Sequence, residues 1–260
     1  MKNISRRTFL KGAAASALSV AAMGKFGLGS LEASADAAEA EESKNLYAPN
    51  DLIPSAYLNP QRTDYRTNEK ELTTLFSPLT IGAINLSHRM VKSAAGSACY
   101  LAGLTDELLQ YYVNFAKGGV EMIWVEGIAS LEPPTDGSHM PEETIAFGQK
   151  LAEECGKYGA SLGYQWAQFG GGENEMTVDD IHAIQARGVE IAKSLKEMGF
   201  KAIEMNAAGF NMGEHFLSRI YNTREDEYGI GSLENRARFV TEWIQAVKTE
   251  VGEDFNVQIL

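Results

Sequence analysis

The chain alternates between short apolar runs and longer segments whose apolar residues recur every three or four positions. The short runs predict buried β-strands, and the longer segments predict helices with one apolar face. The predicted strands are residues 89–94, 120–126, 160–167, a five-residue run within 199–206, and 256–260. The predicted helices are residues 105–117, 143–158, a helix that starts after Thr177 and runs to Gly199, and 233–251. Thr177 and Asp180 suit the first-turn cap of the third helix.

Three glycines mark the points where predicted helices give way to strands. Gly119, Gly159 and Gly199 recur every 40 residues, and a residue without a Cβ closes a helix there at little cost. A repeating strand–helix unit predicts a parallel sheet, which either closes into a barrel or stays a doubly wound open sheet. No G-x-G-x-x-G follows the first predicted strand, as a dinucleotide-binding open sheet would need. The sequence therefore predicts an α/β fold of the TIM (β/α)8 barrel type.

The predicted barrel occupies residues 72–260. A polar stretch with scattered prolines, residues 36–71, precedes it and is typical of a linker or N-terminal extension. Residues 79–86 alternate around a glycine and predict a small hairpin. The last predicted strand reaches Leu260, and a barrel needs further strands to close. We therefore expect this chain to be the N-terminal part of a longer barrel, truncated within strand five.

The N-terminus has the pattern of an export signal. Residues 5–11 read Ser-Arg-Arg-Thr-Phe-Leu-Lys and match the twin-arginine consensus, and a weakly apolar run over 12–31 follows. This run is too polar for a stable membrane span, and residues 33–35, Ala-Ser-Ala, offer a cleavage site. We therefore expect residues 1–35 to be a signal peptide that the twin-arginine translocase recognises, with the mature protein in the periplasm or cell envelope. A disordered tail with chance arginines is the alternative.

Composition and charge narrow the classes of partner. The chain has 44% hydrophobic and 22% charged residues, which is typical of a globular protein. Its net charge of −12 argues against nucleic acid and anionic membrane surfaces as partners. Cys99 and Cys155 permit one disulfide, but their spacing does not predict it. No C-x-x-C pair occurs, so the sequence predicts no zinc or iron–sulfur site.

A polar segment after the fourth predicted strand carries the most specific pattern. It reads Asn-Thr-Arg-Glu-Asp-Glu-Tyr-Gly over residues 222–229 and Ser-Leu-Glu-Asn-Arg-Ala-Arg-Phe over 232–239. Together with the strand in 199–206, it resembles the old yellow enzyme family, the FMN-dependent NADH:flavin oxidoreductases. The resemblance implies a TIM barrel that binds FMN. Arginine–carboxylate pairs fix loops through bidentate hydrogen bonds. We therefore interpret four residues as a network that braces the loop: Asn222, Arg224, Asp226 and Tyr228.

The resemblance also implies which residues contact the flavin. Three small residues close the first predicted strand and resemble the segment whose backbone contacts the ring: Ala94, Ala95 and Gly96. Glu126-Gly127 ends the second strand and matches a Glu-Gly pair, whose glycine packs near the ring. Gln165 matches the glutamine that binds the pyrimidine edge, and an amide suits this task because it donates and accepts at once. A solvated strand glutamine is the alternative.

The catalytic positions depart from the family pattern. The family places a histidine and a second histidine or asparagine three residues apart after strand four, and a proton-donating tyrosine two residues later. Aligned without gaps, these positions are Asn206, Gly209 and Asn211, and the family arginine of strand five falls on Leu260. Asn206 can donate a hydrogen bond but cannot act as an acid. His215, just beyond, is a candidate substitute donor, with a purely structural histidine as the alternative.

Residues 170–172 are three successive glycines after the third predicted strand. Backbone amides in such a run could cradle a phosphate group. A short flexible connection between strand and helix is the alternative, and it is the interpretation we favour.

Two functional hypotheses follow from the resemblance and its departures. The first is an exported FMN-dependent oxidoreductase that reduces a small electrophilic or unsaturated substrate by hydride transfer from reduced flavin. Because an exported enzyme lies outside the NAD(P)H pool, its electrons would come from a membrane or cytochrome donor. The second is a barrel that binds a flavin or ligand without turnover, or carries electrons, since the usual histidine pair and tyrosine are absent.

The export hypothesis is testable at the arginine pair. Replacing Arg6 and Arg7 together with lysine should leave the precursor in the cytoplasm, because the receptor recognises the paired guanidinium groups and not charge alone. Cell fractionation with immunoblotting measures the distribution. Arg62→Lys with Arg66→Lys is the matched control and should be exported normally. Normal export of the Arg6/Arg7 variant would contradict the hypothesis.

Overall fold

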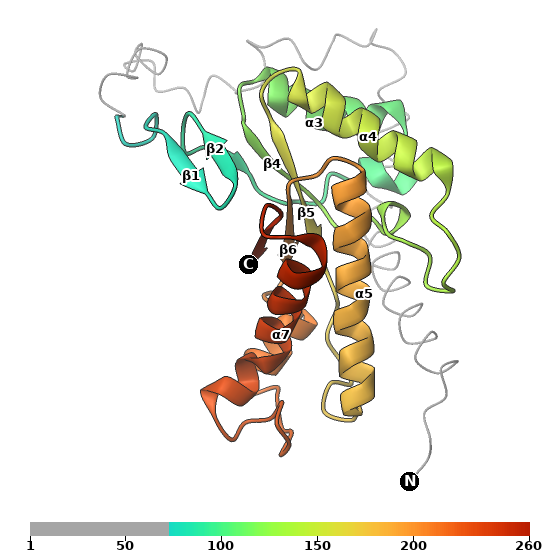
Figure 1. The fold of residues 1–260 in the computed structure, drawn as a ribbon, viewed down its shortest axis with the longest axis vertical. Helices are drawn as coiled ribbons and strands as arrows, with labels where there is room; N and C mark the ends of the chain where they lie inside the picture. The colour runs from blue at the N-terminus through green and yellow to red at the C-terminus, as the bar shows by residue number, and fades with distance from the viewer. Residues whose placement is uncertain (1–72) are drawn as a thin grey trace, which may run out of the picture. The chain divides into compact units, whose positions relative to one another are not determined.

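The computed structural model describes residues 73–260, so the predicted signal peptide and linker lie outside the described residues. These residues belong to one compact unit, Asn68–Leu260. Its centre is a five-stranded parallel sheet whose strands follow one another in chain order (Figure 1). The strands are β3 (Val91–Lys92), β4 (Met122–Val125), β5 (Ser161–Trp166), β6 (Ala202–Met205) and β7 (Asn256–Ile259). The predicted α/β fold with a parallel sheet is confirmed.

Helices connect successive strands and return the chain to the start of the next one. The long helices are α3 (Asp106–Lys117), α4 (Glu142–Gly156), α5 (Val178–Glu197) and α7 (Leu233–Val251). All four match predicted helices to within two residues at either end. Three short helical segments were not predicted: η2 (Cys99–Ala102), η3 (Ala129–Leu131) and α6 (Met212–Leu217). Within residues 73–260, no helix has the length and apolar character needed to cross a membrane.

The ends of the helices follow from a few local residues. The Thr177 hydroxyl accepts a hydrogen bond from the Asp180 amide, and the Asp180 carboxylate accepts one from the Thr177 amide, which is the predicted cap of α5. The three periodic glycines have φ values of 89°, 82° and 91° at Gly119, Gly159 and Gly199. This left-handed conformation strains residues with a side chain. The glycine period in the sequence therefore marks real helix-to-strand turns.

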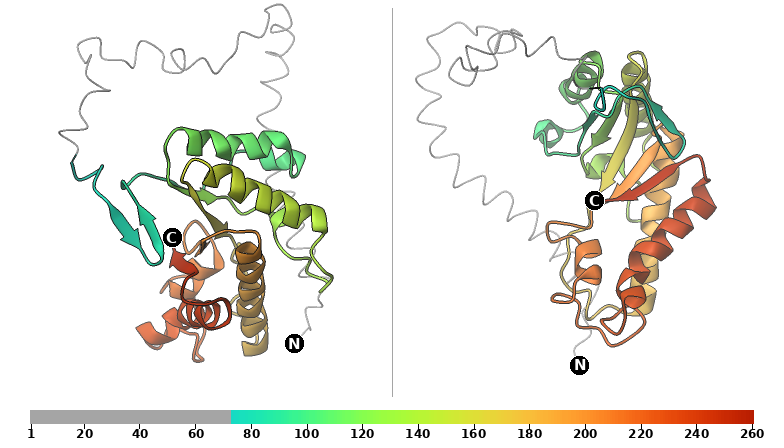
Figure 2. Two further views of the ribbon diagram at one scale, coloured as in Figure 1. Left: turned by 45° about the horizontal axis from the view of Figure 1, so that its top comes forward. Right: turned by 90° about the vertical axis from the view of Figure 1, so that its left-hand side faces the viewer.

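The main core lies between the sheet and the four long helices. Strands β4, β5 and β6 contribute one alternating set of side chains to it, including Tyr164 and Trp166 of β5. Trp166 packs against Trp243 of α7, with ring centroids 5.4 Å apart and both side chains fully buried. Helices α5 and α7 run side by side (Figure 2). Burial of both indoles removes a large apolar area from water on the helix side of the sheet, although within the described residues neither indole Nε1 has a hydrogen-bond partner.

The opposite face of the sheet carries a smaller apolar cluster near the start of the strands. The hairpin β1 (Leu79–Ile81) and β2 (Ile84–Leu86) packs there against Met122 and Trp124. Asn256 of β7 fixes the hairpin turn, since its amide donates to Ile81 O at 2.7 Å and its Oδ1 accepts from the Ala83 amide at 3.0 Å. The predicted hairpin over 79–86 is therefore confirmed, and it covers the N-terminal ends of the strands.

The first barrel strand is much shorter than predicted. We expected residues 89–94 to form it, but β3 contains only Val91 and Lys92. The Arg89 amide bonds to Leu75 O instead, and the Arg89 guanidinium donates to Ser77 Oγ, so this end is held by the preceding loop. Beyond Lys92 the chain leaves the sheet and forms the loop that holds Ala94 to Gly96.

The close packing of α5 yields a stability prediction. A Cβ on Gly188 would lie 2.3 Å from Trp243 Nε1 and 2.6 Å from the Trp166 ring. Gly188→Ala should therefore lower the free energy of unfolding by about 1–3 kcal/mol through overpacking. Urea denaturation followed by circular dichroism measures this change.

Gly156→Ala at the end of α4 is the matched control, because its Cβ would meet no atom within 4 Å. It should leave stability unchanged or raise it by up to about 1 kcal/mol through helix propensity. Equal midpoints for the two variants would mean that the indole pair does not constrain α5 as described.

Candidate functional site

The C-terminal ends of the parallel strands share one edge of the sheet, and most predicted site residues lie at or beside it. Ala94 to Gly96 follow β3, Gly127 follows β4, Gln165 is the penultimate residue of β5 and Asn206 follows β6. Binding sites of parallel α/β folds are formed at this edge. The structure thus brings the predicted flavin-binding residues and one of the two predicted catalytic residues to a single region.

A row of polar side chains crosses β5, β6 and β7 next to this edge. Gln165, Glu204 and Gln258 are direct neighbours in the strand register. Gln165 Nε2 donates to Glu204 Oε1 at 2.6 Å, and Gln258 Nε2 donates to Glu204 Oε2. Gln165 Oε1 accepts a long hydrogen bond, 3.3 Å, from Asn206 Nδ2. Gln165 is therefore a buried, bonded residue rather than a solvated one, and its amide adjoins that of Asn206.

Sequence reasoning missed Glu204, which organises this row. Its carboxylate is buried, and each of its oxygens accepts from a different amide. A buried carboxylate without such partners would be very costly. The signal was present in the sequence, because Glu204 is the charged residue within an otherwise apolar strand, Ala-Ile-Glu-Met.

Glu126 plays a similar part at the ends of β3 and β4. Its buried carboxylate accepts from the Ser97 amide at 3.1 Å, from Ser97 Oγ at 2.5 Å and from the Tyr112 hydroxyl at 2.8 Å. Burial and the hydrogen bond to this carboxylate raise the pKa of Tyr112 well above its usual value. These bonds hold the end of the loop that carries Ala94 to Gly96. Glu126 therefore positions the predicted ring-binding loop.

Small residues lie at the C-terminal ends of β3 and β4, where one allows close packing and another leaves open space. A Cβ on Gly127 would lie 3.1 Å from Gln165 O and 3.4 Å from the Ala167 Cβ, so the Gly127 backbone lies close against the end of β5. A Cβ on Gly96 would meet nothing within 4 Å. Ala95 and Gly96 are exposed, and Ala94 is half-buried.

Lys92 is a buried cation that faces away from this region. Its ammonium lies 5.3–5.6 Å from the ring centroids of Tyr111, Tyr112 and Phe115 and donates to Ser93 O at 2.8 Å. Burial lowers the pKa of Lys92, and the negative charge of Glu126 opposes this shift. The register pairs Lys92 with a core residue of β4, Ile123, which explains why its side chain points toward α3.

The loop after β6 places the three aligned catalytic positions differently. Asn206 lies at the edge, where its Oδ1 accepts from the Ala208 amide at 3.0 Å. Gly209 has φ 60° and offers no side chain. Asn211 is buried, and its amide donates to Ala208 O at 2.6 Å, so it turns into its own loop. Only Asn206 of the three presents a hydrogen-bonding side chain next to Gln165.

His215 in α6 belongs to a separate cluster. Its Nδ1 lies 3.2 Å from Glu173 Oε2, and its ring stacks on Tyr221 with centroids 4.6 Å apart. Within residues 73–260, His215 Nε2 is buried without a hydrogen-bond partner, and no hydrogen bond joins His215 to Asn206. We considered His215 as a hydrogen-bond donor in place of the absent family histidine, but it is not hydrogen-bonded to Asn206. Its contacts with Glu173 and Tyr221 favour a structural role.

Backbone amides of the glycine run 170–172 already donate hydrogen bonds to other groups of the protein. The Gly171 amide donates to both carboxylate oxygens of Glu173, at 2.8 and 2.9 Å. The amide of Gly170 donates to Phe210 O at 2.7 Å. Two of the amides that could have cradled a phosphate are therefore already bonded, which favours the interpretation of this run as a strand-to-helix connection.

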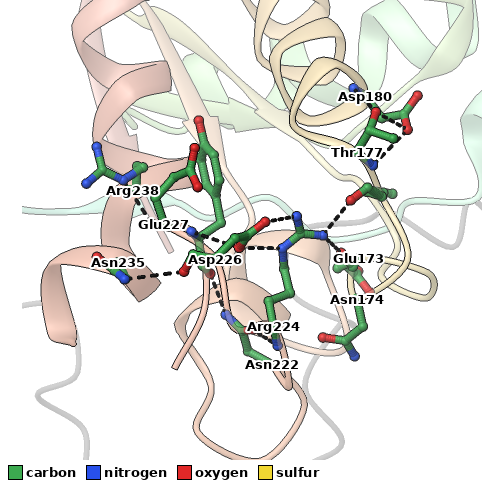
Figure 3. A network of polar contacts seen from close by, with 12 residues as sticks. Glu173, Asn174, Thr177, Asp180, Asn222, Arg224, Asp226, Glu227, Asn235 and Arg238 are labelled. Atoms are coloured by element: carbon green, nitrogen blue, oxygen red, sulfur yellow. Dashed lines mark hydrogen bonds and ion pairs between the residues drawn. The ribbon is translucent and has the colours of Figure 1, made fainter. Parts of the chain in front are cut away.

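The polar segment 222–228 forms the predicted brace (Figure 3). Arg224 makes a bidentate contact with Asp226 and donates to two carbonyls of the loop after β5, Glu173 O at 2.5 Å and Met176 O at 2.7 Å. Asn222 Nδ2 donates to Phe216 O and Tyr228 O, both at 2.8 Å. This network confirms the loop-bracing interpretation and ties the loop after β6 to the loop after β5.

Two cysteines and the acidic and histidine side chains are the remaining candidates for chemistry. Cys99 and Cys155 are both free thiols, and burial raises the pKa of Cys155 to about 12. Within the described part of the chain, no three histidine, cysteine or acidic side chains are grouped so as to hold a metal ion.

Comparison with known proteins relates part of this chain to a flavin oxidoreductase family. Residues 134–259 match the NADH:flavin oxidoreductase / NADH oxidase family. The chain is 31% identical over 205 residues to an NADPH dehydrogenase of Bacillus velezensis, covering 67% of this chain and 60% of the relative. It is 27% identical over 225 residues to a cinnamate reductase of Clostridium sporogenes, covering 71% of this chain and 33% of the relative. The chain thus carries part of a domain of this family and spans between one third and 60% of these relatives.

Solved structures show the same fold. The chain aligns with a 2-naphthoyl-CoA reductase complex with a TM-score of 0.60 and 25% identity, covering 72% of this chain and 35% of the other. It aligns with Old Yellow Enzyme from Pichia sp. AKU4542 with a TM-score of 0.54 and 23% identity, covering 72% and 59% of the two chains. The five parallel strands therefore correspond to part of a TIM barrel of the old yellow enzyme type.

The brace yields a prediction for stability and its pH dependence. Arg224→Lys keeps the charge but loses the forked hydrogen bonds, so it should lower the free energy of unfolding at pH 7 by about 1–3 kcal/mol. The hydrogen bonds from Arg224 hold the pKa of Asp226 below its usual value. The contribution of this pair is therefore fully present above about pH 4 and fades as the pH falls through the lower folded pKa.

Urea unfolding at pH 7 and at successively lower pH measures both effects. The gap between wild type and Arg224→Lys should narrow in acid. Arg238→Lys, at a more exposed ion pair with Glu242, is the matched control and should change stability by less than about 1 kcal/mol. A pH-independent gap would show that the Asp226 carboxylate does not carry the effect.

Proposed function

We propose that this chain forms the flavin-ring-binding part of an exported FMN-dependent oxidoreductase of the old yellow enzyme type. It would reduce a small electrophilic or unsaturated substrate. The observation that carries this proposal is the pair of adjoining amides, Gln165 and Asn206, at the shared edge of β5 and β6. Both lie within the segment that matches the flavin oxidoreductase family.

The residues at this edge fit the ring of FMN. Gln165 is held by Glu204, so its amide has one fixed orientation and could serve the donor and acceptor groups of a pyrimidine edge. Ala94, Ala95 and Gly96 leave the space above β3 open to a flat ring, and Glu126 fixes their loop. Bound FMN would supply the redox chemistry, which is hydride transfer. The side chains of this chain would bind and orient.

Orientation of an acceptor carbonyl falls to Asn206. Its amide can donate one hydrogen bond, but an amide does not release a proton at neutral pH. Gly209 has no side chain, and the amide of Asn211 is bonded to Ala208 O. Losing one well-placed donor typically costs about 10²–10³ in rate. We therefore expect slow reduction of simple enones and faster reoxidation by an acceptor that supplies its own activation.

An electron-carrying or non-catalytic flavin-binding barrel is the second candidate. The specific observation that favours it is the inward turn of Asn211 beside the bare Gly209, which leaves a single hydrogen-bonding side chain where the family has several. Flavin binding is common to both candidates. Turnover with an added acceptor separates them.

The proposed location bears on the electron donor. An exported enzyme has no supply of NAD(P)H, so we propose that a membrane or cytochrome partner delivers the electrons. The twin-arginine pathway carries proteins that are already folded, which would allow FMN to be inserted before export.

The proposal predicts a flavin absorbance spectrum and a rate of enone reduction that two substitutions should raise. The full-length protein that contains this chain should be yellow when purified, should bleach with dithionite and should be reoxidised by an added electrophile, all followed by absorption spectroscopy. With NADPH, wild type should reduce cyclohexenone slowly. Asn206→His with Gly209→Asn should raise this rate about tenfold or more, because it restores two donors at the family spacing. Asparagine also tolerates the left-handed φ of 60° at Gly209.

Gln110→His on the exposed face of α3 is the control for an added imidazole and should leave the rate unchanged. A colourless protein would contradict both flavin hypotheses. Rapid cyclohexenone reduction by wild type with NADPH would show that the altered positions do not limit the reaction.

A further inference from the structure

Glu204 is a buried carboxylate with which no cation forms an ion pair within residues 73–260. Its residue is 4% exposed, and its two hydrogen bonds come from the neutral amides of Gln165 and Gln258. The ion pairs of the described residues all join other side chains. Buried carboxylates are usually paired with a cation or bound to a metal ion. The charge of Glu204 is therefore stabilised by hydrogen bonds alone.

Other charged positions near this edge are arranged differently. Burial lowers the pKa of Lys92, and the negative charge of Glu126 opposes this shift, so these two opposite charges interact. The family resemblance implies an arginine at position 260, but Leu260 carries no charge. The Leu260 amide donates to Met205 O at 3.0 Å, which places this uncharged position at the end of β6. The edge around Glu204 thus lacks the cation that the resemblance implies.

A chain of hydrogen bonds joins Glu204 to the proposed flavin site. Glu204 Oε1 accepts from Gln165 Nε2 at 2.6 Å, and Gln165 Oε1 accepts from Asn206 Nδ2 at 3.3 Å. A carboxylate can only accept hydrogen bonds, so Glu204 determines which end of the Gln165 amide faces Asn206. The charge therefore lies one side chain away from the residue proposed to hold the pyrimidine edge.

The surroundings of Glu204 screen its charge weakly. Gln165 and Glu204 are 8% and 4% exposed, so the Coulomb field of the carboxylate acts through protein rather than through bulk water. Reduction of a flavin adds negative charge to its ring system, and charge near the ring is one of the ways in which a protein tunes this cofactor. A fixed carboxylate beside the ring therefore destabilises the reduced form more than the oxidised form. By thermodynamic linkage, this difference lowers the reduction potential.

We propose that the carboxylate of Glu204 lowers the reduction potential of the flavin bound at this edge and thereby restricts the protein to electron donors of low potential. This inference deepens the proposed function and rests on it. Glu204 is a positioning and tuning residue, because it acts through Gln165 and through its field rather than by touching the reacting atoms. The reduced site is then a strong reductant, and its electron donor has to be a stronger one.

The potential can be measured without turnover. Glu204→Gln in the full-length protein that contains this chain keeps the shape of the side chain and removes its charge. It should raise the midpoint potential by about 30 mV or more, which is a change of about tenfold or more in the ratio of the dissociation constants of oxidised and reduced FMN. A spectroscopic redox titration measures the potential. The dissociation constant of oxidised FMN, from fluorescence titration of the apoprotein, should change by less than about threefold.

Gln258→Lys tests the same charge from the other side. Gln258 Nε2 donates to Glu204 Oε2, and a lysine there keeps a donor while adding the missing cation. This variant should also raise the potential by about 30 mV or more. The two substitutions change different side chains, so a packing defect at one position does not explain a shift in both. If Glu204→Gln does not fold by circular dichroism, Gln258→Lys alone decides the question.

Glu190→Gln is the control for the loss of a carboxylate. Glu190 lies on the exposed face of α5, where water and salt screen its charge, so the potential should stay at the wild-type value. Equal weakening of oxidised and reduced FMN binding in Glu204→Gln, with no shift of potential, would show that Glu204 only supports the fold. That result, or a fall of the potential in either variant, overturns the proposal.

The measurements separate this inference from the proposed function. If the protein is yellow and bleaches with dithionite but its potential is the same in wild type and in both variants, the tuning role of Glu204 is wrong and the proposed function stands. If the full-length protein binds no FMN, the proposed function is wrong and this inference fails with it.

Discussion

The buried carboxylate of Glu204 sets the geometry of the whole strand edge. It accepts hydrogen bonds from Gln165 on one side and Gln258 on the other, so it links three neighbouring strands. A slip of one residue would turn Glu204 into the apolar core beneath the helices and leave both glutamines without this acceptor. The polar row therefore fixes the register, and the register in turn brings Asn206 beside Gln165.

The polar side chains of the edge and the main apolar core lie on opposite faces of the sheet. The face toward the helices holds Trp166, Trp243 and the rest of the main core, while the opposite face holds the polar row and the open loop around Gly96. Even the buried cation Lys92 lies among aromatic rings on the helix side. The edge is consequently formed by amides, carboxylates and small residues, which suits the orientation of a neutral ring system better than acid–base catalysis.

Local features could be predicted from the sequence, and distant pairings could not. The cap of α5 depends on Thr177 and Asp180, three residues apart, and the glycine turns depend on single residues, so both were visible in the pattern. The partner of His215 is Glu173, 42 residues away, and no periodicity reveals such a pair. The length of β3 was overestimated because apolar alternation cannot show that Arg89 bonds to the loop before it.

The candidate site shows the same division. Gln165 and Gly127 could be proposed as site residues because they lie within recognisable segments, but the role of Glu204 depends on strand pairing that only the fold establishes. The aligned positions Gly209 and Asn211 lack the side chains that the family resemblance implies there. Asn211 turns inward and Phe210 faces solvent. The backbone conformation of the loop determines both orientations, and residue identity alone does not reveal them.

The contact between the hairpin and β7 has a consequence for biosynthesis. Ala83 bonds to Asn256, 173 residues further along the chain, so the first described strands cannot reach their final place until the last has been made. At roughly 5–20 residues per second, the ribosome takes about ten seconds or more to synthesise the intervening segment. During that interval the hairpin that covers Met122 and Trp124 lacks its hydrogen bonds to β7 and is held less firmly on this apolar face.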